Sequence, residues 1–209
     1  MEFASEMVVK ATLLQQKVSE VPTVLPPDGR DRPPHLRSFR DGWRHLRFLL
    51  LLCPLWLYLI PATLLMGSGL GLLAWLTPGP RQVGPVVFDV HTMLFGALAA
   101  ILGYQTVWLW AFAKIHGWTS GLLPADTFST RVFDYLNLER GLLAGAALFL
   151  TGLGMSLWLA WDWVGHDMGP LDVTSTLRLA LWGFLAMVLG AQTIYGSFFL
   201  SMLGMARKK

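Results

Sequence analysis

The sequence predicts an all-α integral membrane protein in which four transmembrane helices form two hairpins. The 209 residues are 54% hydrophobic and only 14% charged, a composition too apolar for a soluble domain of this length. A helix needs about 20 apolar residues to cross a bilayer. Four runs without a charged residue reach that length: 48–80, 90–113, 141–161 and 179–206.

The first apolar run is longer than a membrane helix needs. At about 1.5 Å of rise per residue, run 48–80 would be about 50 Å long as a straight helix, against about 30 Å for the hydrocarbon core. We expect the run to tilt, to bend or to lie partly outside the hydrocarbon core, with Pro54 and Pro61 as the bend points.

The distribution of Lys and Arg predicts the orientation. Segment 30–47, the loop between the second and third runs, and the C-terminus together hold twelve Lys and Arg, whereas the two opposite loops hold only Arg81 and Arg178. Positively charged loops stay in the cytoplasm, so both termini are expected on the cytoplasmic side of the inner membrane. Cys53 is the single cysteine, which excludes an intrachain disulfide.

The first 25 residues differ in composition from a membrane protein. Residues 2–16 contain no Pro or Gly and have apolar residues at helical spacing, which predicts an amphipathic helix. Residues 17–25 are rich in Val and Thr, which is typical of a strand. One helix and one strand cannot form a core, because the strand would leave its backbone groups unpaired. This segment is therefore expected to need a partner sheet.

Segment 26–47 combines a rigid connector with a basic helix. Residues 26–34 read Pro-Pro-Asp-Gly-Arg-Asp-Arg-Pro-Pro, which predicts turns. In residues 35–47 apolar and basic residues occupy different sides of a helix, as in helices that lie on a membrane surface. Two interpretations stay open for these arginines: attraction to anionic lipid headgroups, or binding of a specific phosphate by the guanidinium fork.

The membrane runs contain an internal repeat. Residues 102–106 and 189–193 match at an offset of 87, and the glycine pairs in 67–69 and 152–154 match at an offset of 85. We interpret this as two helix hairpins related by a parallel repeat. The glycines would allow close contact between helices, and Gln105 and Gln192 are candidates for a hydrogen bond between them.

Several motifs resemble a known family. The residues are 1–11, Glu20-Val-Pro22, and the Arg-rich segment 28–48, followed by Asp89-Val-His91, Gly103-Tyr-Gln105, Leu138-Glu-Arg-Gly141 and Gly190-Ala-Gln192. Together they resemble the C-terminal part of bacterial family 2 glycosyltransferases, in the branch related to dolichol-phosphate mannosyltransferase. In that family a cytoplasmic GT-A domain binds a nucleotide sugar and a divalent metal, and the sugar is transferred to a polyprenyl phosphate at the membrane.

The resemblance implies a domain organisation for this chain. Residues 1–34 would be a remnant of the GT-A domain, 35–47 an amphipathic interfacial helix, 48–206 the four-helix membrane domain and 207–209 a basic cytoplasmic tail. An Asp-x-Asp motif and a glycine-rich nucleotide loop do not occur before the first run. By resemblance the chain lacks most of the GT-A domain.

The resemblance also implies site residues. No catalytic residue or metal ligand is assigned in this chain, and Mg²⁺ or Mn²⁺ is expected to bind with the GT-A domain. The lipid phosphate would contact the following arginines: Arg30, Arg32, Arg37, Arg40 and Arg44. Glu2 and Glu6 would lie near the acceptor, although carboxylates on an exposed helix surface are the alternative reading.

Two classes of function remain open from the sequence. The first is the anchoring and acceptor-presenting part of a polyprenyl-phosphate glycosyltransferase that is inactive without a donor-binding domain. The second is a non-enzymatic four-span protein that handles or translocates lipid-linked sugar, or that partners a glycosyltransferase. The expected partners are membrane lipid, polyprenyl phosphate and a missing or separate GT-A domain, without nucleic acid, while the oligomeric state is left open.

Overall fold

A computed structural model describes residues 2–24, 38–121, 123, 137–169 and 173–205. Its elements in chain order are α1 (Glu2–Leu13), α2 (Ser38–Leu52), the π-helical turn η1 (Leu55–Leu59), α3 (Ile60–Leu76), β1 (Arg81–Val83), β2 (Val86–Phe88), α4 (Val90–Thr119), α6 (Leu138–Gly165) and α7 (Val173–Met205).

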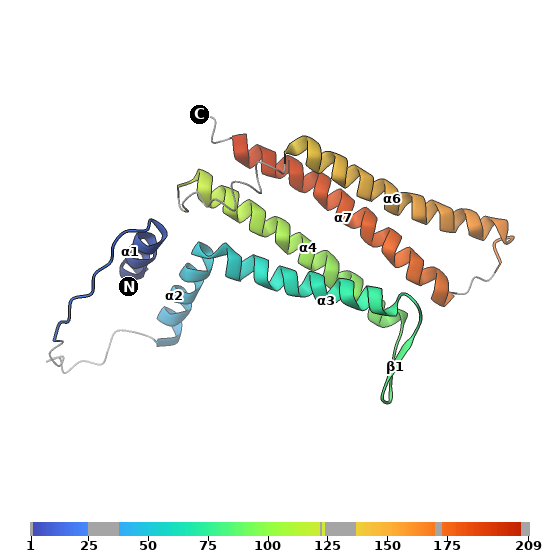
Figure 1. Cartoon of the computed structure of the whole chain (residues 1–209), viewed down its shortest axis with the longest axis horizontal. Helices are drawn as coiled ribbons and strands as arrows, with labels where there is room; N and C mark the ends of the chain where they lie inside the picture. The colour runs from blue at the N-terminus through green and yellow to red at the C-terminus, as the bar shows by residue number, and fades with distance from the viewer. Residues whose placement is uncertain (1, 25–37, 122, 124–136, 170–172, 206–209) are drawn as a thin grey trace.

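Four helical spans confirm the predicted multi-pass membrane fold. The stretches long and apolar enough to cross a bilayer are Leu55–Leu76, Val90–Thr119, Leu138–Gly165 and Thr174–Met205. Helix α3 packs against α4, α6 packs against α7, and α4 joins the two hairpins by packing against α7 (Figure 1). We call the end of the bundle near α1 and α2 the basic end, and the end with β1 and β2 the hairpin end.

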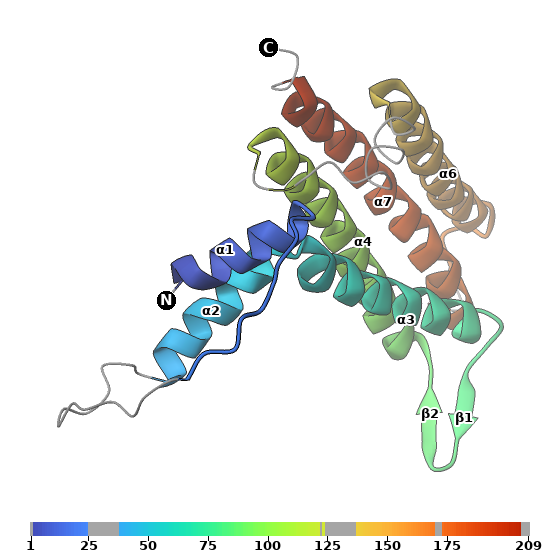
Figure 2. The ribbon, with the colours of Figure 1, turned by 60° about the vertical axis from the view of Figure 1, so that its left-hand side comes forward.

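The first apolar run is divided by a bend, as its length predicted. Helix α2 continues to Leu52, so the interfacial helix extends five residues beyond the predicted boundary at position 47. The chain then turns at Cys53 and Pro54 before η1 begins, and Figure 2 shows α2 at an angle to α3. Pro61 produces no separate bend. It lies beside Ile60, whose N–H donates to the Leu55 carbonyl in the last π-helical bond before α3 continues as α-helix.

The N-terminal segment forms the predicted helix but not the predicted strand. Helix α1 lies beside α2 (Figure 2). Residues 16–24 carry no strand assignment, and the described residues around them provide no strand for pairing. The prediction of a strand over 17–25 was therefore wrong for its described part, because local β-propensity does not make a strand without a neighbour to accept its hydrogen bonds.

A short β-hairpin connects α3 to α4, and the sequence did not predict it. Its antiparallel register pairs Arg81 with Phe88 and Val83 with Val86, and Gly84 closes the turn with φ of +61°. Phe88 packs on Trp75 of α3, with ring centroids 5.8 Å apart. This contact ties the hairpin to the end of the bundle, from which it projects in Figure 2.

Glycines bring the backbones of α3 and α4 into direct contact. A Cβ atom at Gly69 would collide with the carbonyl oxygen of Gly96. At Gly103 a Cβ atom would lie 2.5 Å from the amide nitrogen of Met66 and 2.8 Å from the Ala62 carbonyl oxygen. Such close approach allows van der Waals packing to hold helices together in lipid, where burial of apolar surface gives little advantage.

The α6–α7 hairpin repeats these contacts position by position. Gly152 meets the Gly183 carbonyl oxygen as Gly69 meets that of Gly96. In the same way a Cβ atom at Gly190 would lie 2.5 Å from the Phe149 amide nitrogen and 2.7 Å from the Gly145 carbonyl oxygen.

The repeat is therefore real, but one of its predicted offsets is wrong. The second helices correspond at the predicted offset of 87, whereas the contacts match Gly69 with Gly152, an offset of 83. The predicted offset of 85 aligned Gly69 with Gly154, which has no atom of another residue near its Cβ position. Sequence identity could not distinguish the alignment of Gly69 with Gly152 from that with Gly154, because only contact with the partner helix identifies the packed glycine.

A hydrogen-bonded pair joins the two hairpins near the middle of α4 and α7. The Thr193 hydroxyl donates to the Leu189 carbonyl at 2.6 Å, so its oxygen accepts the proton of the Tyr104 hydroxyl, also at 2.6 Å. The expected bond between Gln105 and Gln192 does not form among the described residues, and the Gln192 Oε1 atom is buried without a partner. Tyrosine and threonine thus supply the link that was predicted for the glutamines.

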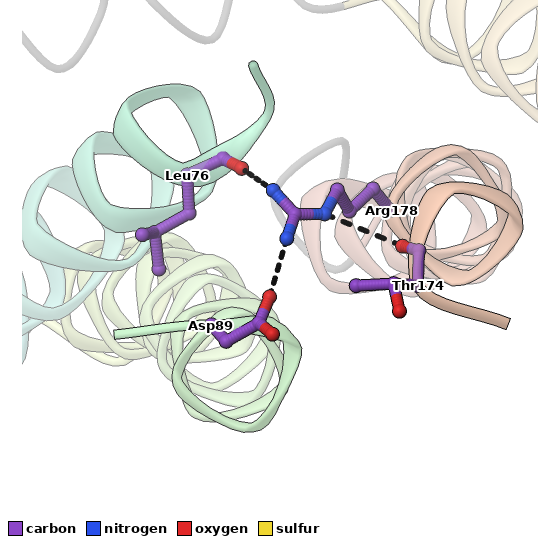
Figure 3. Close-up of polar contacts among 4 residues, drawn as sticks. All are labelled: Leu76, Asp89, Thr174 and Arg178. Atoms are coloured by element: carbon purple, nitrogen blue, oxygen red, sulfur yellow. Dashed lines mark hydrogen bonds and ion pairs between the residues drawn. The ribbon is translucent and has the colours of Figure 1, made fainter. Parts of the chain in front are cut away.

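A buried arginine joins the hairpins at the hairpin end (Figure 3). Arg178 was expected in a loop, but it lies in the second turn of α7 with a residue exposure of 6%. Its guanidinium donates to the Leu76 carbonyl at 2.8 Å and to the Thr174 carbonyl at 3.3 Å, and forms an ion pair with Asp89. One side chain therefore connects the last turn of α3, the residue that precedes α4, and α7.

Two glycines of α6 provide a matched test of backbone packing. Replacement of Gly152 by Ala forces α6 and α7 apart, and we expect it to lower the free energy of unfolding by about 2 kcal/mol, the usual cost of overpacking. Gly154→Ala should be neutral or stabilising, because its Cβ position is open and Ala favours helix by about 1 kcal/mol. Reversible unfolding in mixed micelles measures both, and equal losses would contradict the assigned contacts.

Arg178 should be the critical charge of the membrane region. The change Arg178→Gln leaves Asp89 without its partner, and we expect it to reduce the free energy of unfolding by about 2 kcal/mol, which is below the roughly 3–5 kcal/mol for a fully buried pair because the Asp89 side chain is 38% exposed. Arg81→Gln in the exposed β1 strand serves as the control and should change it by less than about 0.5 kcal/mol. Similar stabilities for the two variants in the same unfolding assay would refute this role.

Candidate functional site

The basic face of α2 is the candidate site that the sequence predicted. Arg40, Arg44 and Arg47 are spaced by four and three residues, which puts them on one side of the helix. All three are exposed, and none forms a hydrogen bond or ion pair with another residue in the part of the chain that the structure describes. Their guanidinium groups are thus available to an anion outside the protein.

An apolar face runs along the same helix. Phe39 is 91% exposed, and Trp43, Leu46 and Leu49 are exposed by 57%, 49% and 40%. An exposed row of large apolar side chains usually marks a surface that contacts a membrane or another protein. Burial of this face in the acyl region of a bilayer would leave the arginines at the level of lipid headgroups, as in interfacial helices generally.

The structure brings only part of the predicted site together. Arg40 and Arg44 lie one helical turn apart on α2, whereas Arg30, Arg32 and Arg37 fall outside the described residues. Glu2 and Glu6 belong to α1, the helix that packs beside α2. The predicted acceptor-side carboxylates and the described phosphate-binding arginines are therefore on neighbouring helices.

Other basic residues belong to the same end of the bundle. Lys114 lies near the end of α4, and Arg140 lies in the first turn of α6. Both make polar contacts within the chain, so they differ from the arginines of α2. This end also holds an open apolar groove of about 520 Å³ between the ends of α6 and α7, lined by Leu138, Tyr195, Phe198, Phe199, Ser201, Met202 and Met205.

The described residues contain no group of three His, Cys, Asp or Glu side chains close enough to share a metal ion. Carboxylate and imidazole groups are the usual ligands of divalent metals in transferases. The described arginines of α2 can bind and orient an anion.

Sequence reasoning missed the Arg178 cluster, although a signal was present. Arg178 is the single charged residue within α7, and Asp89 immediately precedes α4. A charge inside an apolar helix usually has a buried partner. The opposite charge at the end of the adjacent hairpin was the available candidate, and Figure 3 confirms that the two side chains meet.

Two comparisons relate the chain to known proteins. Residues 111–204 match the family model described as glycosyltransferase family 2 C-terminal transmembrane region. The chain is also 33% identical over 211 residues to the low-salt glycan biosynthesis hexosyltransferase Agl6 of Haloferax volcanii, an alignment that covers 98% of this chain.

The chain spans about half the length of this curated relative, 48% of it. No solved structure matches the chain. The family model covers the end of α4, α6 and nearly all of α7, and the alignment with the hexosyltransferase also includes α1 and α2. The chain corresponds to the C-terminal membrane part of a family 2 glycosyltransferase, which confirms the family and the region predicted from its motifs, while the branch related to dolichol-phosphate mannosyltransferase stays a prediction.

Proposed function

We propose that this chain anchors a family 2 glycosyltransferase in the inner membrane and presents a polyprenyl phosphate to its catalytic domain. The completed enzyme would transfer a sugar from a nucleotide sugar to the lipid phosphate. The observation that carries the proposal is the amphipathic helix α2, with its three unpaired arginines beside an apolar face at the entry to the first span. The match to a hexosyltransferase supports glycosyl transfer as the chemistry.

Arginine suits the acceptor that the proposal names. A guanidinium group is permanently charged and offers parallel N–H donors that fit phosphate oxygens. The phosphate of a polyprenyl lipid is held at headgroup depth because its tail is in the hydrocarbon, and α2 is expected at this depth. The phosphate oxygen is already anionic and therefore a nucleophile without a general base, so electrostatic orientation is the main contribution required from this region.

The exposed apolar residues of the N-terminal segment support a docking role toward the catalytic domain. In α1 and the segment after it, six apolar side chains are between 55% and 94% exposed: Met7, Val8, Leu14, Val18, Val21 and Val24. A GT-A domain, in the same polypeptide or as a separate protein, would cover this surface and could pair with residues 16–24 as an edge strand. It would also supply the nucleotide and the Mg²⁺ or Mn²⁺ site.

The proposed orientation places both termini in the cytoplasm. Positive charge is concentrated at the basic end, whereas Arg81 is the exposed basic residue of the described hairpin end. The positive-inside rule assigns the richer side to the cytoplasm, where nucleotide sugars are available.

The arginines can be tested by lipid binding. We expect Arg40→Gln combined with Arg44→Gln to weaken binding to phosphatidylcholine vesicles containing polyprenyl phosphate by about 30-fold, since each basic residue contributes about 1 kcal/mol near an anionic surface. Arg30→Gln with Arg32→Gln should act in the same direction, and Arg81→Gln is the matched control on the opposite side. Equal losses for the control would remove the arginine assignment.

Vesicles of equal charge separate a specific phosphate site from general attraction. If phosphatidylglycerol vesicles bind the native chain as tightly as polyprenyl phosphate vesicles do, α2 is a headgroup anchor and not an acceptor site. Retention of the preference for polyprenyl phosphate at high salt supports the proposal. Salt screens the nonspecific attraction between arginines and anionic headgroups more than it weakens direct binding of one phosphate.

The division of labour can be tested by turnover. The purified chain should transfer no sugar from a nucleotide sugar to polyprenyl phosphate, and the same chain joined to the GT-A domain of a relative should do so in the presence of Mg²⁺ or Mn²⁺. Radiolabelled sugar recovered in the lipid phase measures both reactions. Transfer by the chain alone would contradict the proposed division, and an inactive fusion that binds both substrates would favour a non-enzymatic role.

A further inference from the structure

Gln105 is a polar residue in an otherwise apolar lipid-facing strip. It lies at the midpoint of α4 (Val90–Thr119) and its side chain is exposed. The strip repeats at intervals of four and three residues, and its other members are between 45% and 57% exposed: Leu94, Leu98, Leu102 and Leu109. Because α4 is a membrane span, the amide of Gln105 is expected within the hydrocarbon core, where water is absent.

The chain itself does not satisfy this amide. The Gln105 side chain forms no hydrogen bond with another side chain or backbone group among the described residues, although the neighbouring Thr106 hydroxyl is bonded to the Leu102 carbonyl at 2.7 Å. Gln192 lies near the same depth on α7, because the adjacent Thr193 meets Tyr104. Its Oε1 atom is nevertheless buried without a donor. The two amides that the sequence repeat suggested as mutual partners both remain unpaired.

An unpaired amide facing hydrocarbon has a definite energetic consequence. Transfer of an amide from water to an apolar medium without a compensating hydrogen bond costs several kcal/mol. Lipid tails provide neither donors nor acceptors. A partner must therefore present both groups at mid-membrane depth, which a polar side chain on another transmembrane helix can do.

We propose that the exposed strip of α4 around Gln105 is the interface of a homodimer. A carboxamide is both donor and acceptor, so Gln105 of one copy can donate to and accept from the same residue of a second copy. Because both copies use the same residue at the midpoint of the same helix, a two-fold axis brings the two amides to the same depth. Leu98, Leu102 and Leu109 supply the apolar packing at heptad-like spacing around this pair. The inference does not depend on the proposed glycosyl transfer.

Dilution in liposomes tests the dimer. The native chain with a C-terminal fluorophore is reconstituted in phosphatidylcholine over a range of protein-to-lipid ratios, and the dimer fraction is counted by single-molecule photobleaching. We expect Gln105→Leu to raise the dissociation constant about eightfold, the effect of two average interhelical hydrogen bonds in a membrane. The same chemical change in the β-hairpin, Gln82→Leu, should leave it unchanged.

Two results would overturn the proposal. If the native chain is monomeric at every dilution, this strip contacts a polar helix of a different protein, or lipid, and not a second copy. An unchanged dissociation constant for Gln105→Leu would show that the amide does not hold the dimer.

Cross-linking tests the position of the interface independently of the amide. In a Cys53→Ser background, Leu102→Cys on the α4 strip should form an intermolecular disulfide on oxidation. Leu64→Cys, on the exposed side of α3 with an exposure of 68%, should not. Cross-linking at position 64 and not at 102 would place the contact on α3 and exclude the α4 interface.

Discussion

Direct backbone contact at glycine is the constraint on which the membrane fold depends. In lipid the hydrophobic effect does not drive helices together, so stability must come from close packing and from hydrogen bonds. Gly69 and Gly103 provide this approach in the α3–α4 hairpin, and Gly152 and Gly190 provide it in the α6–α7 hairpin. Because the carbonyl and amide groups at these points lie against glycine, even a methyl group would separate the helices. The two hairpins are consequently rigid units of the same design.

Polar side chains then fix how the two hairpins meet. The Tyr104–Thr193 bond joins them near mid-depth, and Arg178 joins them at the hairpin end through Asp89 and the Leu76 carbonyl. The Leu76 carbonyl at the end of α3 also accepts the Gly79 N–H at 3.2 Å, so Arg178 provides it with a second and shorter hydrogen bond. The free-energy cost of burying the Arg178 charge is offset because each of its three guanidinium nitrogens has a partner. This arrangement has no counterpart in the internal repeat, because His91 occupies the matching position in α4 at the offset of 87.

The sequence predicted the four spans, the bend at Pro54 and the basic amphipathic helix, because each depends on local length, composition or spacing. It failed where the outcome depends on a partner. The alignment of Gly69 with Gly154 was wrong because sequence identity does not show which glycine faces another helix. The prediction of a hydrogen bond between Gln105 and Gln192 was wrong, because the Tyr104 hydroxyl bonds to Thr193 at the same level instead. The strand over 17–25 had suitable residues but no neighbouring strand, and the three-residue strands of the hairpin were too short to give a periodic signal.

The bend at Pro54 connects the rigid bundle to the proposed lipid site. Since α2 leaves the bundle at an angle, its axis can lie along the membrane surface while α3 crosses the bilayer (Figure 2). Helix α1 packs beside α2, so a domain docked on the exposed side chains of α1 would approach the arginines within about one helix diameter, 10 Å. A separation of this size suits transfer to a phosphate that cannot leave headgroup depth. The geometry of the first bend would thus decide where a soluble catalytic domain meets a membrane-bound acceptor, and the glycine contacts would keep that geometry fixed.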